Sequence, residues 1–277
     1  MLKSFDLFQK DGLNLNVSEK FILNIGNEIQ YYKERDFFNF LYNSLEEFIG
    51  IFNDYIVQVI NLFYDNFKEN KQEHFIINDG KKIFDKTSKI YSFNYTKTFE
   101  KFYKVDKDNF TEALERLNVN YKRANEAEFI HGSVVENYNA LEDLKIVLGV
   151  DDIHSSLKKH KLFQFTKYFQ KLHKQTDYLF LKDYEVNTKH KSQTKYTFYF
   201  WGHSLDYSDR QYIREIFDLV EKIEGSKIKI FYHSISAKGD QLKNLLGIIE
   251  KEKIEKFMKF NILEFIESTP ENLFKEL

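Results

Sequence analysis

The chain shows two successive patterns of apolar and polar positions. From Phe37 to Phe63, apolar residues recur at steps of three and four, which is the spacing of one helix face. Gly50 falls within this run and is a candidate break in the helix. Beyond residue 85, short apolar segments alternate with further helical patterns. We predict strands at 89–93, 128–130, 145–148, 196–201 and 227–232, and helices at 98–102, 156–172, 208–222 and 238–251.

This alternation is typical of an α/β fold with a mainly parallel sheet and helices on both faces. Residues 196–232 make a complete strand–helix–strand unit, for which a right-handed crossover is expected. No internal repeat, low-complexity tract or Pro-rich linker marks a boundary. We therefore expect one domain over residues 1–277, in which residues 1–85 are mostly helical and residues 86–277 carry the strand–helix core.

Composition narrows the class of protein. The chain has 277 residues, 42% of them hydrophobic, which excludes a disordered chain. It has no cysteine, which excludes a disulfide scaffold, a thiol nucleophile and a thiolate metal site. The formal net charge of −2 gives no polycation character, so bulk affinity for nucleic acid is not expected. No apolar run reaches the roughly 20 residues of a membrane helix, and the first residues lack a signal-peptide pattern. We expect a cytoplasmic protein without a membrane partner.

Several candidate site residues directly follow predicted strands. Asn94, His131, Gly149 and the loop Gly202–Asp206 all occupy such positions. Because ligands bind beyond the carboxyl ends of the strands in parallel sheets, the fold class would gather these residues along one edge.

The loop that starts at Gly202 contains the largest number of side chains that could take part in a reaction. His203, Ser204 and Asp206 supply a base, a hydroxyl and a carboxylate. Ser208, followed by Gln211, matches a capping box, so we place the helix start there. A helix N-terminus favours an anion or a ribose hydroxyl. The same residues also fit structural roles, with Ser208 only capping and His203 bonding to backbone.

Two further residues are candidates for chemistry. His131 precedes Gly132 and is, with His203, the histidine best placed for a cleft. The Asn94 amide can donate and accept at once, which suits holding a ribose or a water. The local pattern equally describes Asn94 as a turn or cap residue, and favours that interpretation. The sequence contains neither H-x-x-x-H nor H-E-x-x-H, so no metal is expected.

Residues 158–195 are rich in lysine. Ten lysines stand against three acidic residues there. A run of charge is usually a solvated face, and we expect that here. Interleaved aromatic residues such as Tyr168 and Phe169 keep a single-stranded nucleic-acid interface open as a minor alternative.

Three segments together carry a family resemblance. In chain order they are Ser92–Thr96 (SFNYT), Phe129–Ser133 (FIHGS) and Phe200–Asp209 (FWGHSLDYSD). This series resembles the AbiH-like family of bacterial phage abortive-infection proteins, which is distantly similar to sirtuin-like NAD-consuming effectors with a Rossmann-like sheet. The resemblance implies a phage-defence protein that binds a nucleotide such as NAD and hydrolyses its nicotinamide–ribose bond. The alternative is a non-catalytic sensor or interaction protein, or a truncated remnant of such an enzyme.

The resemblance also implies roles for individual residues. Asn94 would position water or the nicotinamide ribose, and His131 would be the general base on a ribose hydroxyl. The residues expected to bind the nucleotide are Tyr95, Gly132, Gly202, His203, Ser204, Asp206 and Asp209. The chemistry needs no metal.

The start of the chain departs from the family pattern. Such proteins open with a strand and a Gly-rich phosphate loop. The nearest candidate, 21–26 (FILNIG), lacks a second glycine and the acidic residue. We therefore expect the N-terminal strand and the phosphate loop to be missing. A missing strand would expose a sheet edge, which favours a homo-oligomer. The expected partners are thus a nucleotide, a second copy of the chain and an unidentified phage-derived trigger.

Overall fold

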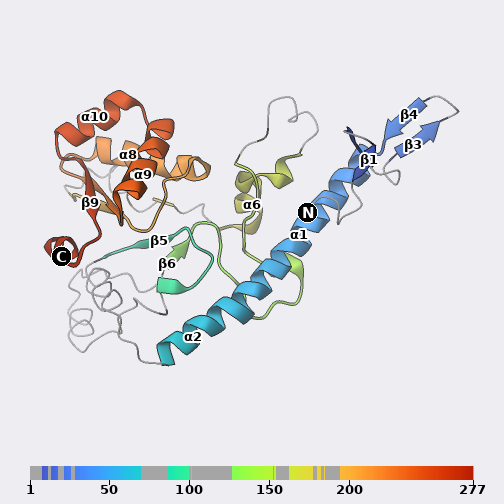
Figure 1. The fold of residues 1–277 in the computed structure, drawn as a ribbon, viewed down its shortest axis with the longest axis horizontal. Helices are drawn as coiled ribbons and strands as arrows, with labels where there is room; N and C mark the ends of the chain where they lie inside the picture. Colours follow the sequence, from blue (N-terminus) through green and yellow to red (C-terminus); the bar gives the residue numbers. More distant parts are fainter. Residues whose placement is uncertain are drawn as a thin grey trace.

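The computed structural model describes residues 8–11, 14–17, 22–25, 29–69, 87–99, 101, 127–151, 153, 162–176, 180–181, 184 and 194–276. Within these ranges, two hairpins precede a long helical rod, and parallel strands with their helices follow (Figure 1).

The first strands form antiparallel hairpins. β1 (Phe8–Asp11) pairs with β2 (Asn14–Val17), and β3 (Ile22–Ile25) pairs with β4 (Ile29–Tyr32). The candidate segment 21–26 therefore supplies a hairpin strand. Because β3 runs antiparallel to its partner, it does not take the place of a first strand in the parallel sheet.

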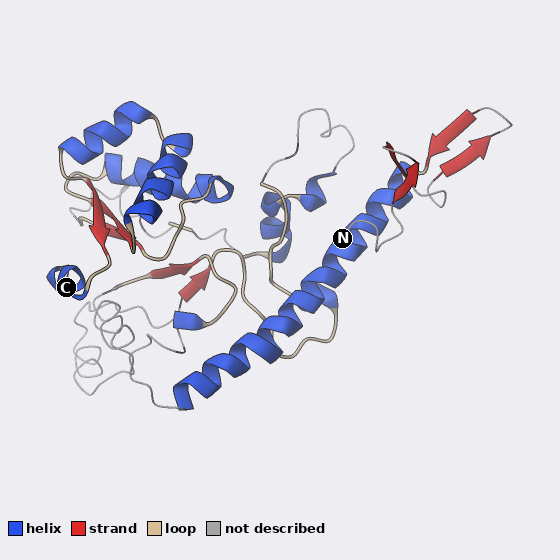
Figure 2. Ribbon diagram, viewed as in Figure 1, coloured by secondary structure: helices blue, strands red, loops and turns tan. Residues whose placement is uncertain are grey.

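One long rod follows the hairpins. It consists of α1 (Glu34–Tyr55), the π-helical segment η3 (Ile56–Asn61) and α2 (Leu62–Glu69), which are continuous (Figure 2). The predicted helix is confirmed, but it passes through Gly50 without a break. A Cβ on Gly50 would lie 2.8 Å from the Leu141 side chain, so the missing side chain lets that leucine approach the rod.

The rod packs on the segment that follows β6. Ile49 and Ile56 are buried against the apolar side chains of Val134, Leu144 and Ile146. The Asn53 side chain adds two hydrogen bonds to one residue, since it donates to the Val135 carbonyl at 2.9 Å and accepts from the Val135 amide at 2.8 Å. This contact fixes the segment on the rod much as a neighbouring strand would.

Residues 145–148, predicted as a strand, form none. The segment is extended, and its Val147 amide donates to the His131 carbonyl at 2.9 Å, but it joins no sheet. Its apolar residues are buried against the rod, and burial of this kind gives the same short apolar run as a strand.

The parallel strands form two small sheets. β5 (Ile90–Ser92) pairs with β6 (Ala127–Phe129). The second sheet has the order β7 (Thr197–Phe200), β8 (Lys227–Tyr232) and β9 (Leu263–Glu267). The α/β class and its parallel strands are confirmed. β9 was not predicted, and neither were the hairpin strands β1 to β4.

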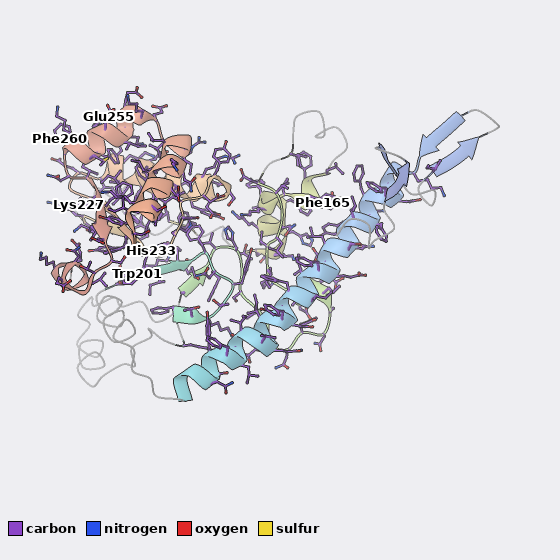
Figure 3. All side chains as sticks on the ribbon, viewed as in Figure 1. Phe165, Trp201, Lys227, His233, Glu255 and Phe260 are labelled. Atoms are coloured by element: carbon purple, nitrogen blue, oxygen red, sulfur yellow. The ribbon has the colours of Figure 1, made fainter. Side chains whose placement is uncertain are left out.

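Helices lie against both faces of the second sheet. α8 (Arg210–Lys222) connects β7 to β8, while α9 (Ile235–Ile248) and α10 (Lys251–Lys259) connect β8 to β9. Ile228 and Ile230 of β8 pack in the cluster formed with these three helices. The next residue, Phe231, packs with Trp201, which Figure 3 labels, and with Leu273 of α11 (Pro270–Lys275).

Short elements complete the described chain. They are η5 (Leu141–Asp143), η6 (Leu162–Phe165), α6 (Lys167–Lys174) and η7 (Tyr207–Asp209). The predicted helix 156–172 corresponds to η6 and α6, and its part at 156–161 lies outside the described residues. Of the predicted helix 98–102, Thr98, Phe99 and Lys101 lie in a helical turn, and the rest is likewise outside. No described helix is both long and apolar enough to cross a membrane.

The two left-handed glycines near the strand ends should respond differently to substitution. Gly132 has φ +75°, and a Cβ there would lie 1.9 Å from the Lys145 carbonyl oxygen. Gly202 has φ +62° but no atom within 4 Å of a Cβ. Gly132→Ala should lower the free energy of unfolding by more than about 3 kcal/mol. Gly202→Ala should lower the free energy of unfolding by about 1–2 kcal/mol, which is the cost of the left-handed backbone conformation for alanine.

Urea denaturation of the purified chain measures both effects. Gly239→Ala is the matched control, because Gly239 lies within α9 with nothing near its Cβ position, and alanine there should be slightly stabilising. Equal midpoints for Gly132→Ala and Gly202→Ala would contradict the close packing of the turn at Gly132.

Candidate functional site

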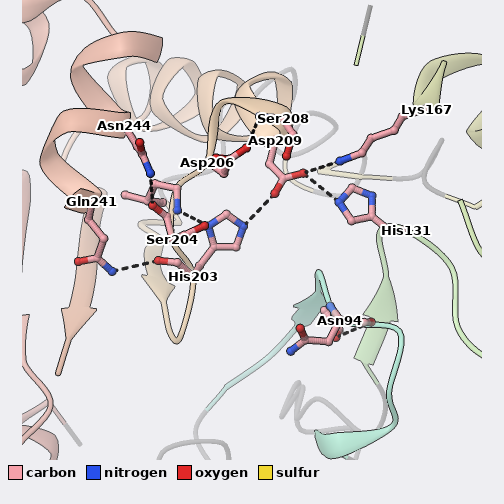
Figure 4. Close-up of polar contacts among 12 residues, drawn as sticks. Asn94, His131, Lys167, His203, Ser204, Asp206, Ser208, Asp209, Gln241 and Asn244 are labelled. Carbon is pink, nitrogen blue, oxygen red and sulfur yellow. Dashed lines mark hydrogen bonds and ion pairs between the residues drawn. The ribbon is translucent and has the colours of Figure 1, made fainter. Parts of the chain in front are cut away.

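Three segments meet just beyond the carboxyl ends of β6 and β7. His131 follows β6, His203 follows β7, and Asp209 ends η7 directly before α8. Figure 4 shows both imidazoles directed at the Asp209 carboxylate. This is the position at which open parallel sheets bind their ligands.

The Asp209 carboxylate is the common partner. His131 Nε2 lies 2.9 Å from Oδ1, and His203 Nε2 lies 3.4 Å from Oδ2. Lys167 Nζ, from the start of α6, lies 3.7 Å from Oδ1. We refer to Asp209, His131, His203 and Lys167 as the Asp209 cluster. His203 Nδ1 accepts a hydrogen bond from the Leu205 amide at 2.9 Å, which leaves its proton on the nitrogen that faces Asp209.

The surroundings of the Asp209 cluster determine which of its side chains are ionised. Burial alone would raise the pKa of Asp209, but the hydrogen bonds from His131 and His203 and the charge of Lys167 hold that pKa well below its usual range. Burial lowers the pKa of His131; the charges of Lys167 and Lys171 act in the same direction, and Asp209 opposes them. At neutral pH we therefore expect an ionised Asp209 beside a neutral His131.

This state leaves one nitrogen of His131 available. Because Nε2 donates to the carboxylate, Nδ1 carries the lone pair. Within the described residues Nδ1 is buried and has no hydrogen-bond partner. A neutral imidazole whose far nitrogen is oriented by a carboxylate is the arrangement of a general base.

Aromatic rings enclose the two imidazoles. The Phe93 ring centroid lies 5.6 Å from that of His131 and 4.6 Å from that of His203. Tyr212 of α8 lies 6.0 Å from His131. These rings contribute to the burial that lowers the pKa of His131. Sequence reasoning missed Phe93, Tyr212 and Lys167, although Phe93 stands inside the SFNYT segment.

Backbone contacts fix His131. The Ile130 amide donates to the Ser92 carbonyl at 2.9 Å, which extends the pairing of β5 and β6 past the strand ends. Gly132 then turns the chain in the left-handed region, where the Lys145 backbone leaves no room for a side chain.

The loop before α8 is held from both ends. Gln241 of α9 donates to the His203 carbonyl at 3.0 Å, and Asn244 donates to the Ser204 carbonyl at 2.9 Å. At the helix end, Asp206 Oδ1 accepts from the Ser208 amide at 2.9 Å. The loop therefore presents His203 to the carboxylate in a fixed position.

The predicted capping box at Ser208 is wrong. Asp206 is the capping residue, the turn η7 comes next, and α8 begins at Arg210. The Gln211 side chain donates to Glu215 instead of returning to the helix start. The inserted turn moves the cap upstream, and it carries Asp209 inward to the imidazoles.

The remaining predicted residues lie around the cluster without joining it. Asn94 is exposed, and the hydrogen bonds described for it connect its backbone to Ser92 Oγ, at 3.3 Å in both directions. No described hydrogen bond connects it to either histidine (Figure 4). The Tyr95 hydroxyl donates to the Val147 carbonyl at 3.0 Å, and burial raises its pKa to about 12. Gly202, Ser204 and Asp206 are exposed.

Comparison with known proteins gives the family of this chain. A family model described as bacteriophage abortive infection AbiH matches residues 8–234. The chain belongs to the AbiH family. The matched residues include the whole Asp209 cluster and all three segments that carry the resemblance. Membership of the AbiH family associates the chain with abortive infection, a bacterial defence against bacteriophage. No curated protein and no solved structure matched the chain.

The site of this AbiH member shows no described metal centre. Within the described ranges, no group of three or more His, Cys, Asp or Glu side chains is arranged to hold a metal ion. Each of the two imidazoles of the cluster instead pairs with the Asp209 carboxylate.

Acid should destabilise the fold through His131. Because the folded state lowers the His131 pKa, the unfolded state binds a proton that the folded state does not. The free energy of unfolding should therefore fall as the pH drops below about 6.5, the ordinary histidine value. His131→Gln removes this titration, so its stability should change less between about pH 6.5 and 5 than that of the parent chain. Asp209, whose pKa is also lowered, keeps its contribution over this range.

Urea denaturation at several pH values measures the slope. His233→Gln, which replaces an exposed histidine outside the cluster, is the control and should follow the parent chain. If His131→Gln also showed the parent's slope, His131 would not be the neutral partner of Asp209.

Proposed function

We propose that this AbiH-family protein binds a nucleotide such as NAD and hydrolyses its nicotinamide–ribose bond during phage abortive infection. The observation that carries the proposal is the buried His131–Asp209 pair, 2.9 Å apart at the carboxyl ends of parallel strands. Family membership supports the setting in phage defence. The nature of the substrate rests on the distant similarity of the AbiH-like family to sirtuin-like NAD-consuming effectors.

His131 is the proposed general base. Its Nδ1 is the acceptor without a described partner, and Asp209 orients the ring from the opposite side. Accepting a hydrogen bond from a ribose hydroxyl would increase the electron density on the sugar. Such density stabilises the positive charge that develops when the bond to nicotinamide breaks.

Exposed groups next to the cluster are the proposed contacts of the substrate. Asn94 is exposed and adjoins Phe93, whose ring contacts both imidazoles, and we assign its amide to the ribose or to the attacking water. Gly202, Ser204 and Asp206 are also exposed, and we assign them to the adenosine half. Tyr95, Gly132 and His203 stay predicted contacts of the nucleotide, besides the structural contacts described above.

The chemistry requires little besides orientation. The nicotinamide ring is already cationic, so it leaves as a neutral molecule when its bond to the ribose carbon breaks. Water then adds to that carbon and releases one proton to the solvent. Correct placement of the ribose and stabilisation of an oxocarbenium-like transition state account for the barrier reduction. No step of this reaction depends on a metal.

A non-catalytic interaction protein is the second candidate. The rod exposes a series of apolar side chains, each about half exposed or more: Phe48, Ile51, Tyr55, Val59 and Leu62. Apolar residues exposed together favour a contact with another protein, and a second copy of the chain would fit this role.

Incubation with NAD separates the two candidates. The purified full-length protein should release nicotinamide. His131→Ala and Asp209→Asn should each lower the rate by about 10²–10⁴-fold, the usual contribution of a general base. Asn94→Ala should lower it less, because it orients the substrate without moving a proton. His233→Ala is the control and should retain the parent rate. Chromatography of the released nicotinamide measures all five proteins.

Two outcomes would favour the interaction protein. One is no release of nicotinamide by the folded parent protein, and the other is equal release by the parent and all variants. Sedimentation velocity of the parent protein and of Ile51→Lys would then test whether the exposed rod joins two copies.

A further inference from the structure

Two described helices reverse the usual arrangement of apolar residues inside and charged residues outside. The first is α6, in the lysine-rich segment that was expected to be a solvated face. That expectation is wrong for α6, because Lys171 and Lys174 are only 6% exposed while Tyr168 and Leu172 are 60% and 53% exposed. The second is the rod formed by α1, η3 and α2, which exposes a series of apolar side chains.

Other groups of the same chain account for the inward lysines of α6. Lys174 Nζ donates to the Ile146 carbonyl at 2.9 Å and lies 3.4 Å from Glu46 Oε2. Lys171 Nζ lies 4.0 Å from the centroid of the Tyr212 ring. A buried ammonium group is stable when such groups accept it. Contacts within the chain therefore explain the orientation of α6.

The rod carries a row of exposed apolar side chains at spacings of three and four positions, which is the spacing of one helix face. Figure 1 shows the rod running along one side of the described structure, apart from the sheet β7–β9. The members of the row are each about half exposed or more, and we refer to them as the outer stripe: Phe48, Ile51, Tyr55, Val59 and Leu62.

The other side of the rod packs on the chain itself. Ile49 and Ile56 are 0% and 4% exposed, in the cluster that includes Val134. Asn53 is 1% exposed and exchanges two hydrogen bonds with Val135. Substitutions in the outer stripe therefore leave these packing contacts in place.

The outer stripe lies in a part of the rod that has almost no charge. Between Phe48 and Tyr64, Asp54 is the only charged residue. Its carboxylate accepts a hydrogen bond from the Tyr138 hydroxyl at 3.2 Å, so it faces the segment that packs on the rod. Depletion of charged residues is typical of the core of an interface between proteins. The stripe therefore fits an apolar partner better than a nucleic acid or a lipid headgroup.

The outer stripe has the same spacing when it is read in either direction. Phe48 and Leu62 each stand seven positions from Tyr55, and Ile51 and Val59 each stand four positions from it. Two identical subunits related by a two-fold axis need such a self-complementary surface, because every contact between them occurs twice. An antiparallel pair of rods with the axis at Tyr55 meets this need. It places the partner subunit's Leu62 beside Phe48, and the partner subunit's Val59 beside Ile51.

The area of the outer stripe is close to what such a pair requires. An aromatic side chain buries roughly 150–250 Å² and an aliphatic one somewhat less, so five side chains that are about half exposed offer on the order of 500 Å². Two copies would together bury about 1,000 Å², which is near the lower limit for a specific interface. Because the area is small, we expect a reversible dimer with a dissociation constant of about micromolar size.

We propose that two copies of this protein associate through the outer stripe, with the rods antiparallel and the two-fold axis at Tyr55. The inference rests on the second candidate function, whose partner it specifies, and it does not depend on hydrolysis of NAD. A helix face thus takes the place of the sheet edge from which a homo-oligomer was expected. The segment that follows His131 packs on the opposite side of each rod and stays outside this interface.

Sedimentation velocity of the full-length protein tests the association. The parent should show a monomer–dimer equilibrium between about 1 and 100 μM. Ile51→Lys and Val59→Glu should each raise the dissociation constant at least about hundredfold, because the two-fold axis repeats each substitution and buries two charges without partners. Leu246→Lys is the matched control, since Leu246 is 47% exposed on α9, and it should associate as the parent does.

A mixture of Ile51→Lys and Val59→Glu tests the direction of the pairing. In an antiparallel pair, the new lysine of one copy faces the new glutamate of the other, and the second contact of the dimer keeps its isoleucine and valine. The mixture should therefore recover a dimer within about tenfold of the parent affinity. A parallel pair would set each new charge against an apolar residue, and the mixture would then stay monomeric.

Three results would overturn the inference: a parent that stays monomeric at about 100 μM, a dimer that both substitutions leave unchanged, and a mixture that recovers no dimer. Release of nicotinamide by a monomeric parent would overturn the pairing and leave the hydrolase. A recovered dimer without release of nicotinamide by the parent would support the pairing and contradict the hydrolase. Circular dichroism melting shows whether each variant is folded; if one is not, Phe48→Lys and Leu62→Glu, related by the same axis, replace the pair.

Discussion

The requirement to pair one buried carboxylate governs the arrangement of this protein. An ionised Asp209 is stable away from water only if donors surround it. Those donors come from three separate segments: the turn after β6, the loop after β7 and the first residue of α6. The carboxylate therefore sets the distances between parts of the chain that no sheet connects, since β5–β6 and β7–β9 are separate within the described residues.

The backbone around the cluster serves this pairing. Gly132 turns against the Lys145 backbone, and Gln241 and Asn244 hold the loop that carries His203. Because each imidazole is held by main-chain contacts, neither needs to reorganise to meet the carboxylate. The result is a neutral base with a fixed tautomer, which is a useful catalytic group and also a rigid structural connection.

Polarity on two helices departs from the usual pattern of apolar inside and charged outside. α6 turns lysines inward and aromatic residues outward, and the rod exposes apolar residues over several turns. The first departure places positive charge beside the cluster. The second leaves apolar side chains on the surface of the rod. The catalytic and the interaction interpretations thus depend on different surfaces of one molecule.

The sequence by itself determined the α/β class, the strands β5 to β8 and the three loops that follow β5, β6 and β7, because periodicity and turn residues act locally. It did not predict the hairpin strands β1 to β4. It did not separate the apolar run at 145–148, buried by the rod, from a strand, and it missed β9, whose glutamates interrupt the apolar pattern. Only the tertiary structure decided that Asp209 joins His131, 78 positions away, and that α6 faces inward with its lysines. Those outcomes depend on which segments pack together, and a buried charge is resolved by partners that are distant in the chain.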